Sequence, residues 1–151
     1  MTYSQICYDV IRAVATITLN RPERLNAWTP TMAAEFRQAM EQANNDPQVR
    51  AIIVTGAGKG FCSGVDMNAL DGMTSSGKTP SKSFTPLDPA AREDFQHPMT
   101  WLPSVGKPII AAVNGAAAGL GLALLLFCDL RFASRNAAFV TSFSRRGLIA
   151  E

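Results

Sequence analysis

Apolar side chains recur along the first half of the chain in two periods, which predict strands and a helix. Residues 6–10 and 14–19 are rich in β-formers on either side of Arg12-Ala13, a pattern typical of a β-hairpin. A helix should follow, with Thr29 as its N-cap and Pro30 in its first position. Its apolar positions fall on one face: Met32, Phe36, Ala39, Met40 and Ala43. Asn44-Asn45-Asp46-Pro47 should end it.

Two later apolar runs are each followed by a glycine-containing segment. Residues 51–55 (AIIVT) are almost wholly apolar, as expected for a strand covered on both faces. A glycine-rich loop over 56–64 then leads into a short helical start at 66–70. Residues 109–113 form the second predicted buried strand, followed by a turn at Asn114-Gly115.

A helix from near Ala117 to about Phe127 and a strand over 130–133 should complete the pattern. Strands and helices in alternation predict an α/β fold. Between the two halves, residues 71–94 are rich in Ser, Thr, Pro and Gly and predict a surface loop. The final residues carry no helix stop signal and no polar tail, so we expect a truncated chain.

Composition limits the class of protein. With 151 residues, 47% hydrophobic and 17% charged, the chain should form one globular domain over residues 1–151. The net charge of +2 lacks the basic stripe of nucleic-acid-binding proteins. The three cysteines lie far apart and form no CxxC pair, which argues against a zinc site or a disulfide framework. The start lacks the pattern of a secretory signal, so we expect a cytoplasmic protein.

One stretch tests for membrane insertion. Residues 108–128 contain no charge over 21 positions, a length that would permit a transmembrane helix. Pro108 opens the run, however, and Asn114-Gly115, Gly119 and Gly121 interrupt it. A buried strand, a turn and a buried helix explain the run better, and we expect no membrane partner.

The two glycine-containing loops carry the chemical signal. The first, residues 56–66, fits neither a Walker loop nor a dinucleotide fingerprint, because the spacing of its glycines and Lys59 fails both. The second, residues 114–121, also leads from a strand to a helix. Each loop alone is explained by tight connection and close packing. Together they would place free N–H groups at neighbouring strand ends, the arrangement of an oxyanion hole.

Five blocks of the sequence follow one another along the chain: residues 19–27 (LNRPERLNA), 60–66 (GFCSGVD), 107–115 (KPIIAAVNG), 119–121 (GLG) and 128–130 (CDL). In these blocks and in their order, the sequence resembles the crotonase, or enoyl-CoA hydratase/isomerase, superfamily. The resemblance implies a crotonase-like fold of repeated ββα units, here without the family's carboxy-terminal helices. It also implies an acyl-CoA substrate, no prosthetic group, no metal, and a trimer or dimer of trimers once the chain is completed.

The resemblance assigns roles to individual positions. The oxyanion donors would be the backbone N–H groups of Val65 and Leu120. The substrate, including its coenzyme A part, would lie along two segments and beside the glycines that precede the donors: Arg24, Leu25, Ala27, Gly64, Asp66, Met67, Asn68 and Gly119. Arg24 could meet a phosphate or remain a solvated surface cation.

The acidic residues distinguish between reactions. The two glutamates of the family's hydratases would fall at Ala123 and near Phe143, neither of which ionises. The segment 145–151 resembles that of Δ3-Δ2 enoyl-CoA isomerases, whose single glutamate base would be Glu151. One carboxylate suffices to move one proton, so isomerisation is favoured. Hydration as in fatty-acid β-oxidation, or a truncated non-catalytic CoA-binding protein, are the alternatives.

Other reactive residues fit structural roles better. His97 lies before Pro98 with no partner base or nucleophile nearby in the sequence, which favours a surface or capping role. Cys62 and Ser63 lack a histidine in a fitting position, so a hydrolase triad is not expected. Asp129 should cap a helix or pair with Arg131 or Arg135.

Overall fold

The amino-terminal strands form the predicted hairpin at one edge of a sheet. The computed structural model describes residues 2–69 and 99–141. Strands β1 (Ile6–Ile11) and β2 (Val14–Leu19) pair antiparallel, with Ile11 opposite Val14. Arg12 and Ala13 connect them with φ values of 50° and 67°, as a two-residue turn of the type I′ class requires.

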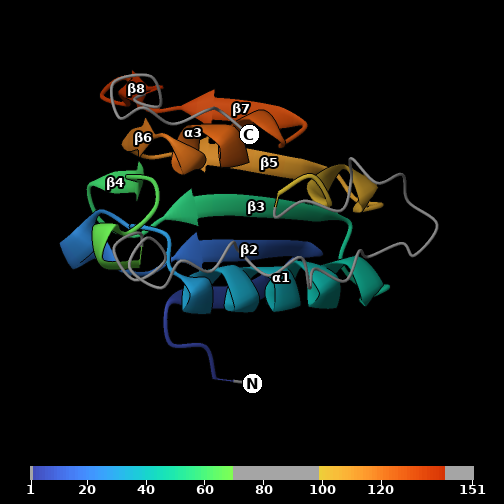
Figure 1. Ribbon diagram of the computed structural model, residues 1–151. Coiled ribbons are helices and arrows are strands. Elements are labelled where there is room, and N and C mark those ends of the chain that lie inside the picture. The colour runs from blue at the N-terminus through green and yellow to red at the C-terminus, as the bar shows by residue number, and fades with distance from the viewer. Residues whose placement is uncertain (1, 70–98, 142–151) are drawn as a thin grey trace.

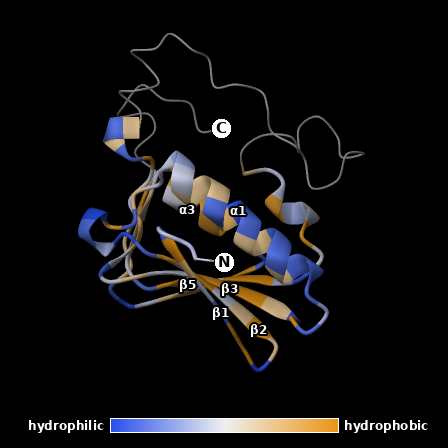
Figure 2. Ribbon diagram, turned by 90° about the horizontal axis from the view of Figure 1, so that it is seen from below, coloured by the Kyte–Doolittle hydropathy of each residue, from blue (hydrophilic) through white to orange (hydrophobic). Residues whose placement is uncertain are grey.

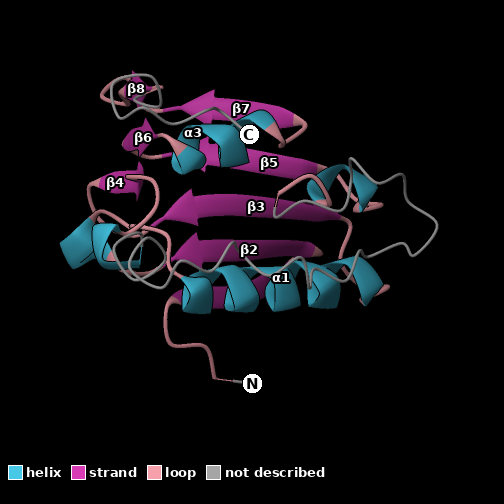
Figure 3. Cartoon of the chain, in the orientation of Figure 1, coloured by secondary structure: helices cyan, strands magenta, loops and turns pink. Residues whose placement is uncertain are grey.

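The strands form two sheets (Figures 1 and 3). The larger sheet has the order β1-β2-β3-β5-β7 and is parallel from β2 onwards. Its remaining strands are β3 (Ala51–Gly56), β5 (Ile109–Val113) and β7 (Leu130–Ala133). The smaller sheet consists of β4 (Gly60–Cys62), β6 (Ala116–Ala118) and β8 (Phe139–Val140). Figure 1 shows it at the carboxyl ends of the large-sheet strands.

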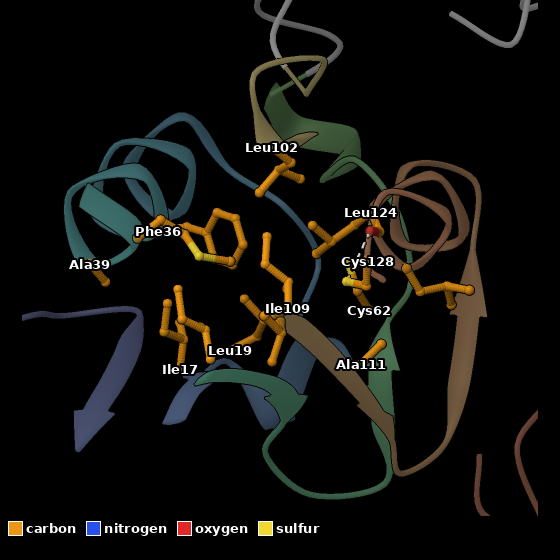
Figure 4. Packing of buried hydrophobic residues seen from close by; sticks show 14 of the residues in the cluster. Ile17, Leu19, Phe36, Ala39, Cys62, Leu102, Ile109, Ala111, Leu124 and Cys128 are labelled. Carbon is orange, nitrogen blue, oxygen red and sulfur yellow. Dashed lines mark hydrogen bonds between the residues drawn. The ribbon is translucent and has the colours of Figure 1, made fainter. Parts of the chain in front are cut away.

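Helices α1 and α3 lie on the same side of the large sheet (Figure 2). Helix α1 (Pro30–Asn45) begins as predicted, because the Thr29 Oγ1 atom accepts a 3.0 Å hydrogen bond from the Met32 N–H. All five residues of its predicted apolar face are buried. Figure 4 shows how Phe36 packs over Ile17 and Leu19 of β2, while Leu124 of α3 lies toward Ile109 and Ala111 of β5. Short 3-10 turns at Pro22–Arg24 and Leu102–Ser104 complete the described elements.

The structure differs from the sequence prediction at three places. Residues 116–118 form strand β6, and helix α3 (Leu120–Leu126) starts after Gly119, so the predicted helix start at Ala117 is wrong. Ala117 is buried where β6 pairs with both β4 and β8. The first glycine loop likewise contains β4. In β3 only alternate residues are fully buried, so the expected cover on both faces is not complete.

The remaining structural predictions have mixed outcomes. The Asp129 carboxylate accepts a 2.7 Å hydrogen bond from the Ile109 N–H, and Arg131 donates to carbonyl groups around the end of α3, including that of Cys128 at 2.6 Å. Asp129 therefore acts structurally, but on the backbone of β5. The predicted loop over 71–94 lies outside the described residues. In the described ranges, no helix is long and apolar enough to cross a membrane.

Candidate active site

Two asparagine side chains hold the loop between β3 and β4. Asn26 is fully buried and donates through Nδ2 to the carbonyl oxygens of Ala57 and Gly60, at 2.9 and 2.8 Å. Asn114, which follows β5, donates to Gly58 and Gly60 at 3.0 and 3.1 Å. The Gly60 carbonyl thus accepts from both amides. Through this shared acceptor, the residues after the 3-10 turn and the residues before β6 are both bonded to the first residue of β4.

The loops that follow β4 and β6 approach each other at two glycines. Gly64 has φ +98° and Gly119 has φ +51°, backbone conformations that residues other than glycine rarely adopt. A Cβ atom at Gly64 would lie 3.0 Å from the Ala118 carbonyl oxygen and 3.8 Å from the Leu120 nitrogen. The absence of that atom leaves space immediately beside the Leu120 N–H.

The backbone around these glycines directs two N–H groups away from their own loops. The Gly64 carbonyl accepts a 2.7 Å hydrogen bond from the Trp28 N–H, so the Val65 N–H of the same trans peptide points to the other side. The Gly119 carbonyl accepts from the Ala123 N–H at 3.0 Å, which turns the Leu120 N–H outward from the start of α3. Within the described residues, neither the Val65 nor the Leu120 N–H has an acceptor.

The two segments predicted to line the substrate site lie side by side. The Ser63 N–H donates to the Leu25 carbonyl at 3.0 Å, and the Ser63 hydroxyl donates to the Arg24 carbonyl at 3.2 Å. Leu25 and Met67, one in each segment, expose 43% and 51% of their surface. Three other predicted lining residues belong to the same two segments: Arg24 and Asn68 are exposed, and Ala27 is buried.

Asp66 differs from the other predicted lining residues, because its carboxylate is held by the protein. The Arg21 Nη1 atom lies 2.9 Å from Asp66 Oδ2 and donates a second hydrogen bond of 2.7 Å to the Ala27 carbonyl. The hydrogen bond from Arg21 is the main reason why the pKa of Asp66 is lowered. Its second oxygen accepts from the Asn68 N–H at 3.0 Å. The side chain of Asp66 therefore ties the two segments together.

The nearby thiol and hydroxyl groups are not prepared for nucleophilic attack. Cys62 is fully buried, and burial raises the pKa of its thiol to about 11. Ser63 uses its hydroxyl on a backbone carbonyl. Among the described residues, no group of three or more His, Cys, Asp and Glu side chains could hold a metal ion.

Three residues of the sequence prediction, His97, Phe143 and Glu151, lie outside the described residues. Ala123 lies in the second half of the first turn of α3, and no carboxylate can come from that position. Sequence reasoning missed the roles of Arg21, Asn26 and Asn114. A buried asparagine and an arginine between a strand and a proline carry little signal on their own, because their partners come from residues that are distant in the sequence.

Comparison with known proteins identifies the family. The model of a family described as enoyl-CoA hydratase/isomerase matches residues 10–151. The chain belongs to the enoyl-CoA hydratase/isomerase family. It is 40% identical over 152 residues to a 1,2-epoxyphenylacetyl-CoA isomerase of Escherichia coli (strain K12), covering 97% of this chain and 53% of the relative. It is 39% identical over 137 residues to an (E)-benzylidenesuccinyl-CoA hydratase of Thauera aromatica, covering 89% and 48%.

Solved structures of the same family confirm the crotonase-like α/β fold. A putative enoyl-CoA hydratase/isomerase (crotonase) from Legionella pneumophila superposes with a TM-score of 0.81 at 30% identity, over 99% of this chain and 55% of that one. A putative enoyl-CoA hydratase/isomerase from Mycobacterium abscessus gives 0.77 at 36% identity, over 97% and 54%. The chain thus spans about half the length of the family members that it matches.

Proposed function

We propose that this family member binds acyl-CoA thioesters and stabilises a negative charge on the thioester oxygen through the N–H groups of Val65 and Leu120. The observation that carries the proposal is that both N–H groups lack an acceptor within the described residues and flank the space left by Gly64. Donors that are already in place do not have to reorganise when the negative charge develops. Each such donor typically increases the rate about a hundred- to a thousand-fold. The proposal is supported by relatives named for reactions of CoA thioesters.

The exposed apolar side chains suggest how the substrate lies. Leu25 and Met67 would contact the pantetheine part, while Arg24 at the exposed end of the 3-10 turn would meet a phosphate. Both donors are main-chain groups, so substitutions of the Val65 and Leu120 side chains should leave them in place. Coenzyme A enters as part of the substrate and not as a prosthetic group.

The reaction that we propose is Δ3-Δ2 enoyl-CoA isomerisation with Glu151 as the single base. A thioester makes its α-proton acidic, and the two N–H groups would stabilise the thioenolate that forms when the proton leaves. Glu151 would remove the proton from one carbon and return it to another. Hydration is the second candidate, favoured by relatives named enoyl-CoA hydratase. Ala123 argues against hydration, because an alanine cannot supply one of the two carboxylates that would activate the water.

The experiment compares the two reactions in the whole protein. We expect conversion of a 3-enoyl-CoA to the 2-enoyl isomer, slow hydration of 2-enoyl-CoA, and a loss of at least about a hundred-fold in isomerisation in Glu151→Gln. Hydration as fast as isomerisation would contradict the single-base assignment. Binding of the thioester without either reaction would instead support a non-catalytic CoA-binding protein.

We also propose that the whole protein forms a homo-oligomer, a trimer or a dimer of trimers, and that it is located in the cytoplasm.

A further inference from the structure

A series of hydrogen bonds and peptide groups begins at the Arg21 side chain and ends at the Val65 N–H. The Arg21 Nη1 atom donates to the Ala27 carbonyl at 2.7 Å. The other end of that peptide group, the Trp28 N–H, donates to the Gly64 carbonyl at 2.7 Å. The other end of this second peptide group is the Val65 N–H. Since all of these peptide bonds are trans, carbonyl and N–H point in opposite directions in each, and the series runs one way.

Peptide groups linked in this way polarise one another. A cation that donates to the first carbonyl withdraws electron density from its N–H, which then donates more strongly to the next carbonyl. The effect is larger where water is excluded. Ala27 and Trp28 expose only 9% and 6% of their surface, Gly64 is buried, and the Arg21 side chain exposes 18%. The partial positive charge on the Val65 N–H should therefore rise.

We propose that Arg21 is a positioning residue that strengthens the Val65 N–H as an oxyanion donor, acting through the peptide groups 27–28 and 64–65. The inference rests on the proposed function, because it assigns the charge that this N–H would stabilise. Asp66 holds the guanidinium in place and at the same time partly neutralises it, since both hydrogen bonds use the same Nη1 atom. The charge of Arg21 supplies the polarising effect, and Asp66 contributes to it only by anchoring that charge.

The test uses the whole protein and a saturated acyl-CoA whose thioester carbonyl carries ¹³C. The infrared stretch of this carbonyl falls as the hydrogen bonds to it strengthen, so the bound ligand reports on the donors directly. In Arg21→Gln, we expect a smaller fall in the stretch, a decrease in kcat of about tenfold and a KM within about twofold. This decrease is less than that for loss of a whole donor, because the Val65 N–H itself remains.

Two further variants distinguish polarisation from anchoring. Arg21→Lys keeps the charge and should restore most of the carbonyl shift. Asp66→Asn removes the anchoring carboxylate but leaves the charged guanidinium its hydrogen bond to the Ala27 carbonyl, so its loss of carbonyl shift should be smaller than that in Arg21→Gln. Arg50→Gln is the matched control, because Arg50 is an exposed arginine that precedes β3 at the end of the sheet far from the site. It should change neither the shift nor kcat.

Several outcomes would overturn the inference. A folded Arg21→Gln variant with the parent's carbonyl shift and kcat would do so, as would equal losses in Arg21→Gln and Asp66→Asn without rescue by lysine. If Arg21→Gln fails to fold, Arg21→Lys decides: a carbonyl shift close to that of the parent protein supports the inference, and loss of most of the shift overturns it. A parent protein that binds the thioester without shifting its carbonyl would refute the proposed oxyanion hole as well.

Discussion

Replacing Asn26 by alanine should remove a large part of the protein's stability, although Asn26 is a small polar residue. Three hydrogen bonds would be lost: those that Nδ2 donates to Ala57 and Gly60, and the 2.8 Å bond that Oδ1 accepts from the Arg21 N–H. At about 1 kcal/mol net each, they amount to about 3 kcal/mol. Asn26 also has φ +56°, and an alanine there costs about 1 kcal/mol more. The expected loss is about 4 kcal/mol.

Urea denaturation of the whole protein measures this loss as a change in the free energy of unfolding. Asn26→Gly separates the two contributions, because glycine tolerates the positive φ and loses only the hydrogen bonds, so its loss should be about 3 kcal/mol. Asn20→Ala is the matched control at an exposed asparagine and should stay within about 0.5 kcal/mol. A loss below about 1 kcal/mol in Asn26→Ala would refute the reasoning, since the Asn114 amide alone would then suffice to hold the loop.

Three further measurements check other parts of the structure. Gly64→Ala should lower kcat about a hundred-fold, because its Cβ would enter the space beside the Leu120 N–H, whereas Gly106→Ala, with only a side-chain atom 3.6 Å away, should not. A thiol reagent at pH 8 should modify the exposed Cys7 rapidly and the buried Cys62 only after unfolding; since burial raises the pKa of Cys62 to about 11, its thiol is protonated at that pH, and equal rates would contradict this. The 151-residue chain should self-associate in sedimentation experiments, because apolar side chains at α3, β7 and β8 expose about half or more of their surface: Leu126, Leu130, Phe132, Phe139 and Val140. Phe132→Ser should reduce this association more than Ile11→Ser at the opposite edge, and a monodisperse monomer would show the expectation to be wrong.

The exposed apolar side chains of α3, β7 and β8 lie mostly outside the uncharged run over 108–128. Ile109, Val113, Leu124 and Leu125 of this run are buried, and Leu126 is its one large apolar side chain among the exposed ones. The other four exposed side chains lie on β7 and β8, which are strands at the open edges of the two sheets. An edge strand is defined by its neighbours in space, which no pattern along the chain reveals.

Local signals in the sequence determined the elements with strong periodicity or punctuation. The hairpin followed from its β-rich runs, and α1 followed from Thr29, Pro30 and the spacing of its apolar face, since these depend only on residues within one or two turns. The five motif blocks were sufficient to identify the family, because their order and spacing are specific.

Only the tertiary structure decided what joins these elements into a candidate site. Strand β6 consists of three alanines, which favour a helix by intrinsic propensity, and it is a strand because β4 and β8 supply its hydrogen-bond partners. The series from Arg21 to the Val65 N–H likewise connects three parts of the chain, and its bond from Trp28 to Gly64 joins residues 36 positions apart (64 − 28 = 36). Propensity acts over neighbours in sequence, whereas hydrogen bonds between loops depend on where the two sheets bring distant backbone groups together.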